Sequence, residues 1–163
     1  MTAKQFMNEI EKIGAIQQIK QLKARYFRAA DTKNMPLMAT VLAHDCMLDF
    51  TGACKDPGTG IDLLPTVTED PIRSRDEAIE KFSNGEGLVT VHHGHTCEIE
   101  LHGPDNASAI WAMTDHLYFP PASPVEMLTG HGHYHETYER IDGTWLIKSL
   151  RLTRLRVETT MRA

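Results

Sequence analysis

The sequence predicts an α+β domain in which three N-terminal helices cover one face of a curved antiparallel sheet. Two observations lead to this fold class. In the first half of the chain apolar residues recur at helical spacing, whereas from about residue 89 onward they alternate with polar residues as in half-buried strands. Helices followed by a run of hairpin-connected strands are typical of α+β domains. A twisted sheet under helices leaves a cone-shaped apolar cavity, which suits a flat hydrophobic ligand.

The composition is that of a single globular domain spanning residues 1–163. Hydrophobic residues make up 41% of the chain and charged residues 24%, both ordinary for a soluble protein. The net charge of −5 and the lack of a basic run argue against nucleic acid or an anionic membrane as partner. No export signal or long apolar run is seen, so membrane insertion is not predicted. Three cysteines without metal-ligand spacing favour a reducing cytoplasmic location without disulfides.

A long amphipathic helix is predicted from about residue 9 to residue 30. Tyr26 lies on its apolar stripe near the C-terminal end and could simply be a core tyrosine with its hydroxyl hydrogen-bonded. Asp31 follows directly, where the helix dipole disfavours negative charge, so solvent or a cationic partner should compensate it. The other members of the apolar stripe are Ile13, Ile16, Ile19, Leu22 and Ala30.

A second, short helix and a first strand are expected next. Asn34 is a suitable N-cap for a helix that runs through Leu42, and Pro36 is tolerated in the first turn of such a helix. A short strand should follow around residues 46–51.

A long loop and a third helix complete the first half of the chain. Residues 52–71 are rich in Gly, Pro, Asp and Thr, and loops of this length often cover a binding pocket. Ser74 and Glu77 have the spacing of a capping box, which would open a helix that Asn84 ends.

The stretch VTVHHGHTCEIEL at residues 89–101 is predicted to be the strand that carries the chemistry. In its second half apolar residues alternate with glutamates. Strict alternation would put His92 on the glutamate face, but a bulge at Gly94 would turn it to the apolar face. An imidazole aimed into a pocket suits proton transfer near neutral pH. The alternative is a solvated histidine cluster at a sheet edge, and His93 and His95 are expected to face outward.

Two ionisable residues lie on apolar rows of later strands. The strand at residues 107–119 places Asp115 among apolar side chains, where a carboxylate needs a partner or a raised pKa. It is a candidate site residue or, alternatively, a structural acid bonded to a backbone N–H or an arginine. Arg154 lies on the apolar row of the last strand, residues 145–157, and burial of an arginine is costly unless it is paired. Asp115 or Asp31 is its natural counter-ion.

A histidine row on the strand at residues 130–141 suggests a different chemistry. His131, His133 and His135 share one face, with Glu136 adjacent, so a zinc or iron site is an alternative. Alternating residues on one strand, however, spread over too long a row to bind one ion without a further ligand. No metal is therefore predicted.

A resemblance to a known family rests on four segments: IKQLKARYFRAAD, VHHGHTCEIEL, WAMTDHLYF and YERIDGTWLIKSLRLTR. They resemble the SnoaL-like branch of the nuclear transport factor two-like superfamily, over nearly the whole chain from about Ile16 to Arg154. Within that branch the chain is similar to bile-acid 7α-dehydratase and, more distantly, to scytalone dehydratase. The resemblance implies the cone-shaped, cystatin-like fold without a metal or other cofactor. It is less specific for function, because this fold hosts several kinds of enzyme and also non-catalytic subunits.

The resemblance also implies a set of site residues. The tyrosine and the following acid of the dehydratase fall on Tyr26 and Asp31, the catalytic histidine on His92, and the inward acid and the terminal arginine on Asp115 and Arg154. The residue pattern had singled out the same five positions.

One departure from the bile-acid enzyme concerns the strand after the second helix. There the enzyme has a further tyrosine and this chain has Phe50, which removes a hydroxyl from the expected pocket. Phe50, Trp111 and Met113 are expected to line that pocket.

Together these features predict a cofactor-independent dehydratase-like lyase or an isomerase. His92 would remove a proton next to a carbonyl of a flat hydrophobic, steroid- or polyketide-like substrate. Asp31 or Asp115 would orient the base, and Tyr26 would donate to the enolate oxygen or protonate the leaving hydroxyl. The alternative is a non-catalytic module or subunit that holds a hydrophobic ligand, although a passive cavity has no need of buried ionisable groups. By analogy with relatives, a homodimer or homotrimer is expected.

Overall fold

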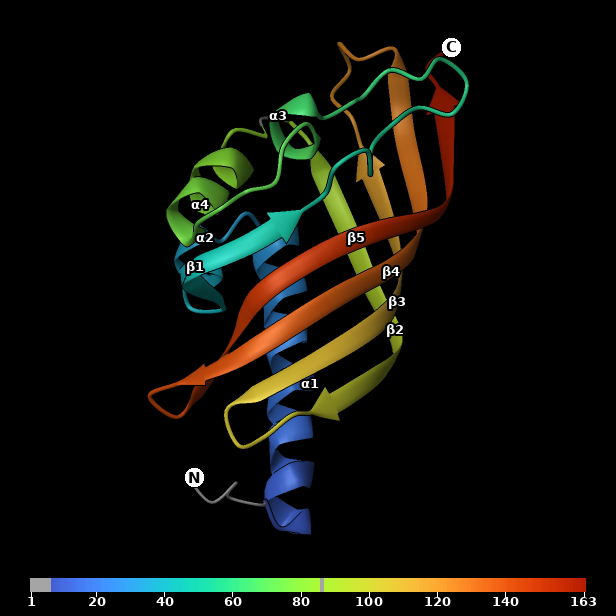
Figure 1. Ribbon diagram of the computed structural model, residues 1–163. Helices are drawn as coiled ribbons and strands as arrows, with labels where there is room; N and C mark the ends of the chain where they lie inside the picture. Colours follow the sequence, from blue (N-terminus) through green and yellow to red (C-terminus); the bar gives the residue numbers. More distant parts are fainter. Residues whose placement is uncertain (1–6, 86) are drawn as a thin grey trace.

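The computed structural model describes residues 7–85 and 87–163 of the chain (Figure 1). Within these residues the helices are α1 (Glu9–Asp31), α2 (Met35–Ala39), α3 (Pro65–Thr68) and α4 (Arg75–Ser83). The strands are β1 (Leu42–Asp49), β2 (Val89–Leu101), β3 (Asn106–Tyr118), β4 (Val125–Ile141) and β5 (Thr144–Met161).

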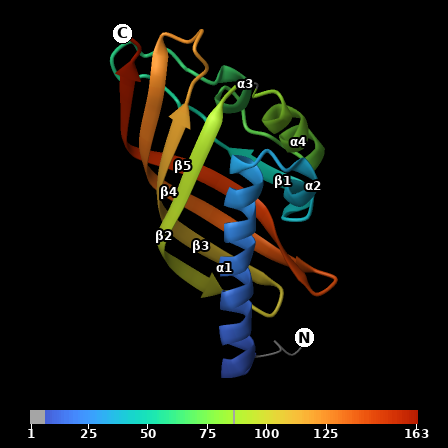
Figure 2. The ribbon, with the colours of Figure 1, turned by 180° about the vertical axis from the view of Figure 1, so that it is seen from behind.

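The strands form one curved, open sheet in the order β1-β5-β4-β3-β2. α1 lies across its concave face, and α2, α3 and α4 gather near β1 at one end of the sheet (Figures 1 and 2). The predicted α+β class is thereby confirmed. One difference is that β1 pairs parallel with β5, while β2 to β5 pair antiparallel. No hairpin joins β1 to β5, so no tight turn forces these two strands to run antiparallel.

The long helix begins with the capping box of Asn8 and Glu11, whose side chains and backbone N–H groups bond each other at 2.8 and 2.9 Å. Its buried face includes Ile19, Leu22 and Tyr26, as predicted. Ile13, in contrast, is 67% exposed, so the predicted apolar stripe was wrong there. The first turns of α1 extend past the sheet (Figure 1).

The short helices keep their predicted caps but not all of their predicted lengths. The Asn34 side chain accepts a hydrogen bond from Leu37 N at 3.0 Å, yet α2 ends at Ala39 and β1 already begins at Leu42. A short, continuous apolar run fits a buried strand as well as a helix, so periodicity could not place this boundary. At α4 half of the predicted capping box forms: the Ser74 hydroxyl accepts from Glu77 N, but the Glu77 carboxylate accepts from Arg73 N instead of Ser74 N. The loop at residues 52–71 contains the single turn α3.

The predicted bulge in β2 is confirmed. His92 pairs with Asp115 and Cys97 pairs with Trp111 on β3, and the register shifts between Gly94 and Cys97. His92 therefore shares the inner face with Cys97, although the two residues are five positions apart and strict alternation would place them on opposite faces. A glycine is needed at position 94 because a Cβ there would lie 2.7 Å from the ring of Phe27 on α1.

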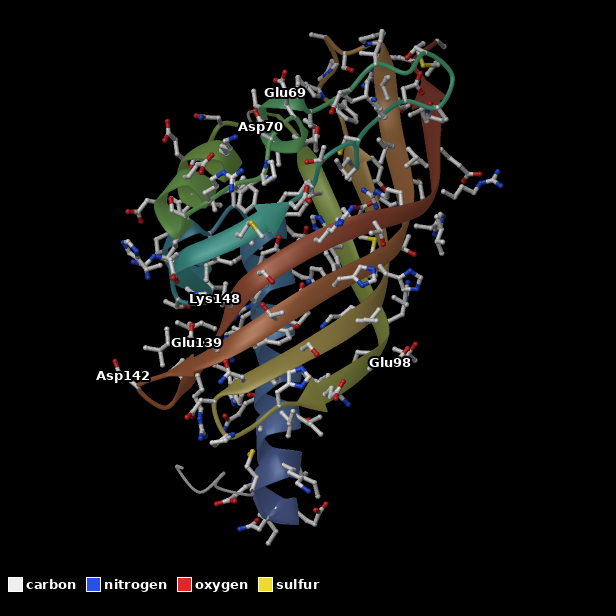
Figure 3. The ribbon with its side chains drawn as sticks, in the orientation of Figure 1. Glu69, Asp70, Glu98, Glu139, Asp142 and Lys148 are labelled. Carbon is white, nitrogen blue, oxygen red and sulfur yellow. The ribbon has the colours of Figure 1, made fainter. Side chains whose placement is uncertain are left out.

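A second bulge changes the inner face of β5. Tyr138 pairs with Ile147 and Thr137 with Ser149, so Lys148 is the extra residue. As a result Ile147 is buried and Leu146, which was expected on the inner face, is not. Lys148 points outward and bonds Glu139 of β4 at 3.4 Å; both are labelled in Figure 3.

The remaining elements agree with the sequence pattern in most respects. The Asp142-Gly143 turn joins β4 to β5, and both residues have positive φ, as the expected two-residue hairpin requires. β4 begins at Val125, five residues before the start of the strand predicted at residues 130–141. None of the described helices has both the length and the apolar content that a membrane crossing needs.

The close packing of α1 on β2 generates the first testable prediction. Gly94→Ala should lower the free energy of unfolding by about 1–3 kcal/mol, because the added methyl group overpacks the contact with Phe27. Gly14→Ala is the matched control: its Cβ meets open space on α1, and the variant should be stabilised by about 0.5–1 kcal/mol. Chemical denaturation measures both. Equal stability of the two variants would contradict the packing.

Candidate active site

A cavity of about 420 Å³ lies between the inner face of the sheet, the C-terminal end of α1, α4 and the loop at residues 52–71. Its wall is mainly apolar, as a site for a hydrophobic ligand requires. The loop supplies several of these apolar residues, as its length suggested. The polar side chains in the lining include Tyr26, Thr90, His92, Asp115, Tyr134 and Arg154.

The structure brings His92 and Asp31 together at the wall of this cavity. Nδ1 of the imidazole lies 2.5 Å from Asp31 Oδ1, and the backbone N–H of His92 donates to Oδ2 at 3.0 Å. The hydroxyl of Thr90 donates to Oδ1 at 2.9 Å. These contacts supply the compensation that a carboxylate at the C-terminal end of a helix needs.

The electrostatics of this pair favour a charged Asp31 carboxylate. Partial burial alone would raise the pKa of Asp31, but the hydrogen bonds from His92 and Thr90 outweigh it and hold the pKa below its ordinary value. An ionised carboxylate only accepts hydrogen bonds, so the Nδ1 proton points to Asp31. Within the described residues Nε2 makes no hydrogen bond to the protein, which leaves it as the free nitrogen of a ring that lines the cavity.

An aromatic stack fixes the plane of the imidazole. The Phe27 ring of α1 lies parallel to the His92 ring, with 5.8 Å between centroids and 7° between planes. Gly94 leaves the space that Phe27 occupies. The imidazole is thus held by a hydrogen bond at one edge and by a ring on one face.

A buried ion pair forms another part of the wall. Arg154 binds Asp115 with two hydrogen bonds, of 3.0 and 2.9 Å, and the two side chains are 11% and 3% exposed. Of the two predicted counter-ions, Asp115 is therefore the partner. Arg154 Nε also donates to the Ala53 carbonyl at 2.9 Å, which ties the loop to the sheet. The pair lies directly over Gly130, where a Cβ would come within 2.2 Å of the guanidinium.

Two tyrosines line the cavity as neutral hydroxyls. Burial, and to a lesser extent nearby negative charge, raises the pKa of Tyr26 and of Tyr134 far above the ordinary value. Tyr26 was predicted and Tyr134 was missed. The signal for Tyr134 was present, because it alternates with His133 and His135 and must therefore face inward.

Of the three residues expected to line the pocket, Phe50 does so, in an edge contact with Phe82 at 6.1 Å between centroids. The prediction was wrong for Trp111 and Met113, which face the inner side but lie outside the cavity. Trp111 donates to the Tyr138 hydroxyl at 2.9 Å, deeper in the core, and Met113 lies behind Arg154. The strands are longer than the cavity, so a shared face does not imply a shared pocket.

The histidine row of β4 lies on the opposite face of the sheet from the cavity. His131 bonds the Thr114 hydroxyl at 3.2 Å and His135 bonds the Thr153 hydroxyl at 3.1 Å. In the part of the chain that the structure describes, no three His, Cys, Asp or Glu side chains are grouped so that they could hold a metal ion. Glu136 points inward, away from this row, and is buried.

Comparison with known proteins agrees with this architecture. A probable cyclase of Gibberella zeae, FGR4, is 28% identical over 138 residues, which cover 84% of this chain and 89% of the relative. A candidate scytalone dehydratase of Novosphingobium aromaticivorans has a similar structure, with a TM-score of 0.76 and 14% identity over 96% of this chain and 94% of that one. So has hexachlorocyclohexane dehydrochlorinase LinA-type3 of Novosphingobium barchaimii, with a TM-score of 0.69 and 13% identity over 94% of each chain.

The family itself is shown by the sequence. The profile of the SnoaL-like domain family matches residues 11–151, which include β1 to β4 and the first part of β5. The fold agrees, since helices cover the concave face of a curved open sheet. The chain therefore belongs to the SnoaL-like family, within the nuclear transport factor two-like superfamily, as its sequence predicted.

Proposed function

We propose that this protein is a cofactor-independent lyase or isomerase that removes a proton next to a carbonyl of a flat hydrophobic, steroid- or polyketide-like substrate. The observation that carries the proposal is the His92–Asp31 pair at the wall of an apolar cavity. The named relatives, a cyclase, a dehydratase candidate and a dehydrochlorinase, support chemistry of this general kind.

In the proposed reaction, Nε2 of His92 takes the proton from the carbon next to the carbonyl. The C–H electron pair forms a C=C bond while the carbonyl oxygen becomes an enolate oxygen, and Asp31 stabilises the imidazolium that results. Tyr26, as a neutral hydroxyl, donates a hydrogen bond to the enolate oxygen. The enolate then either expels a β-hydroxyl group, which leaves as water with the proton from His92, or regains the proton at another carbon, which moves the double bond.

The Asp115–Arg154 pair has a supporting role in this scheme. Its two charges largely offset each other, so the wall presents an oriented dipole instead of a free charge. Arg154 also holds the loop at residues 52–71 through Ala53, and this loop forms one side of the cavity. The pair would keep the shape of the cavity constant during turnover.

Removal of the base tests the proposal directly. His92→Ala should lower turnover of β-hydroxy ketones of the steroid or polyketide type by about 10²- to 10⁴-fold and leave the fold intact. Formation of the conjugated enone is followed by its ultraviolet absorption, and circular dichroism reports the fold. His95→Ala, on the exposed part of the same strand, is the control and should keep wild-type turnover. If His92→Ala retains turnover, His92 is not the base; if no ketone is turned over but the cavity binds one, the protein is a binding module.

The hydrogen bonds to Asp31 predict a pH dependence of stability. Because folding lowers the pKa of Asp31 below its ordinary 3.8, its charged form contributes stability above that pH and loses it as the pH falls through the lower folded value. Asp31→Asn should therefore cost about 2 kcal/mol near neutral pH and progressively less in acid. Denaturation curves over a pH series measure this difference. Glu126→Gln, at an exposed acid of β4, is the control, and a pH-independent effect of Asp31→Asn would contradict the pairing.

The buried Asp115–Arg154 pair predicts a strong asymmetry between single and double variants. Arg154→Ala should lower stability by about 3–5 kcal/mol, because it leaves the Asp115 carboxylate buried without its partner. Arg154→Met combined with Asp115→Leu should recover most of that loss. Arg156→Ala, two residues away on β5 with a 71% exposed side chain, should change stability by less than about 0.5 kcal/mol. An unchanged melting temperature of Arg154→Ala would show that the pair is not essential to the wall.

A further inference from the structure

A second buried ion pair lies in the core beside the cavity and takes no part in the reaction above. Lys23 of α1 bonds Glu136 of β4, and their side chains are 1% and 0% exposed. Moving two charges out of water is costly, and apolar residues of similar size in such places often leave stability unchanged or raise it. Stability alone therefore does not explain why this core contains two charges.

The Glu136 carboxylate is held directly by side chains of α1 and β4, and indirectly by a side chain of β3. One oxygen accepts from Lys23 of α1, and the other accepts from the hydroxyl of Tyr138, which lies on β4 like Glu136 itself. Tyr138 in turn accepts a hydrogen bond from Trp111 Nε1 of β3 at 2.9 Å. Burial and the Glu136 charge keep the pKa of Tyr138 well above its ordinary value, so its hydroxyl remains a donor. The carboxylate is thus a fixed point for the end of the Lys23 side chain.

The amino group of Lys23 lies against three aromatic rings. Nζ is 3.7 Å from the centre of the Tyr134 ring, 4.5 Å from that of Phe27 and 4.7 Å from that of Tyr26. Burial lowers the pKa of Lys23, and the Glu136 carboxylate counteracts this. A desolvated cation attracts the faces of aromatic rings. Two of these rings, Tyr26 and Tyr134, line the cavity, and the third stacks on His92.

We propose that the Lys23–Glu136 pair is a positioning device for the base: it fixes Phe27, and through Phe27 it fixes the plane of the His92 imidazole. Asp31 holds only the Nδ1 edge of that ring, and a ring held at one edge can still turn about the hydrogen bond. The stacked Phe27 ring prevents this rotation, and its own position depends on the Lys23 amino group. Catalytic groups need such support, because small errors in orientation are costly in rate. The consequence of this positioning for turnover rests on the proposed function, whereas its effect on the orientation of the His92 ring does not.

The test compares the wild type with the double variant Lys23→Met/Glu136→Leu by NMR of the free protein. Removing both charges together leaves no unpaired buried ion, so the melting temperature should stay the same or rise. The His92 ring protons should nevertheless lose the ring-current shift from Phe27, and the ¹⁵N signals of the ring should move from the Nδ1–H tautomer toward a mixture. Lys148→Met/Glu139→Leu is the matched control, since it removes a partly exposed pair between the same strand β4 and its neighbour β5, together with the contact of Lys148 to Asp45 of β1 at 2.6 Å. It should change neither signal.

A folded Lys23→Met/Glu136→Leu variant with unchanged His92 signals would overturn the proposal and leave the pair a structural role only. If that variant does not fold, Glu136→Gln decides. It keeps an acceptor for Tyr138 and removes the negative charge that holds the Lys23 amino group, so the same loss of ring-current shift is expected and its retention overturns the proposal. Both readouts are independent of turnover, so a negative result for the His92→Ala assay would not affect them.

Discussion

The contact between the end of α1 and strand β2 is the interaction on which the rest of the structure depends. Asp31 ends α1 and accepts hydrogen bonds from the side chain and backbone of His92 and from Thr90. Without them, a half-buried carboxylate at the negative end of a helix dipole would be unfavourable. The same contact fastens the helix to the sheet, closes one side of the cavity and assembles the candidate base with its orienting acid.

Two buried ion pairs join distant elements of this protein. Asp115–Arg154 links β3 to β5 at the cavity wall, and Lys23–Glu136 links α1 to β4 behind it. Each charge is paired, and Glu136 and Arg154 make further hydrogen bonds to Tyr138 and Ala53, which helps a core to tolerate ions. In surroundings of low dielectric constant such fixed groups act more strongly on a ligand than they would in water. The cavity is therefore both apolar and electrostatically ordered.

The cavity also shows how this chain differs from the dehydratase that its sequence resembles. Phe50 stands where a tyrosine was expected from that enzyme, and it packs against Phe82 as part of an apolar wall. Among the described residues that line the cavity, the phenolic hydroxyl groups are those of Tyr26 and Tyr134, on α1 and β4. A reaction in this cavity would thus receive phenolic hydrogen-bond donors from the side of the helix and the central strands.

The sequence by itself determined which way the side chains of β2 and β3 point. Alternation placed Asp115 on the inner face, and the glycine among the histidines of β2 located the bulge that turns His92 inward. Only the tertiary structure decided which part of each strand lines the cavity and which side chains from other elements lie opposite it. Trp111 shares a face with Asp115 but lies outside the cavity, and Lys23 on α1 meets a carboxylate that is far away in sequence. The physical reason is that periodicity reports direction, whereas depth and partners follow from how α1 packs across the curved sheet.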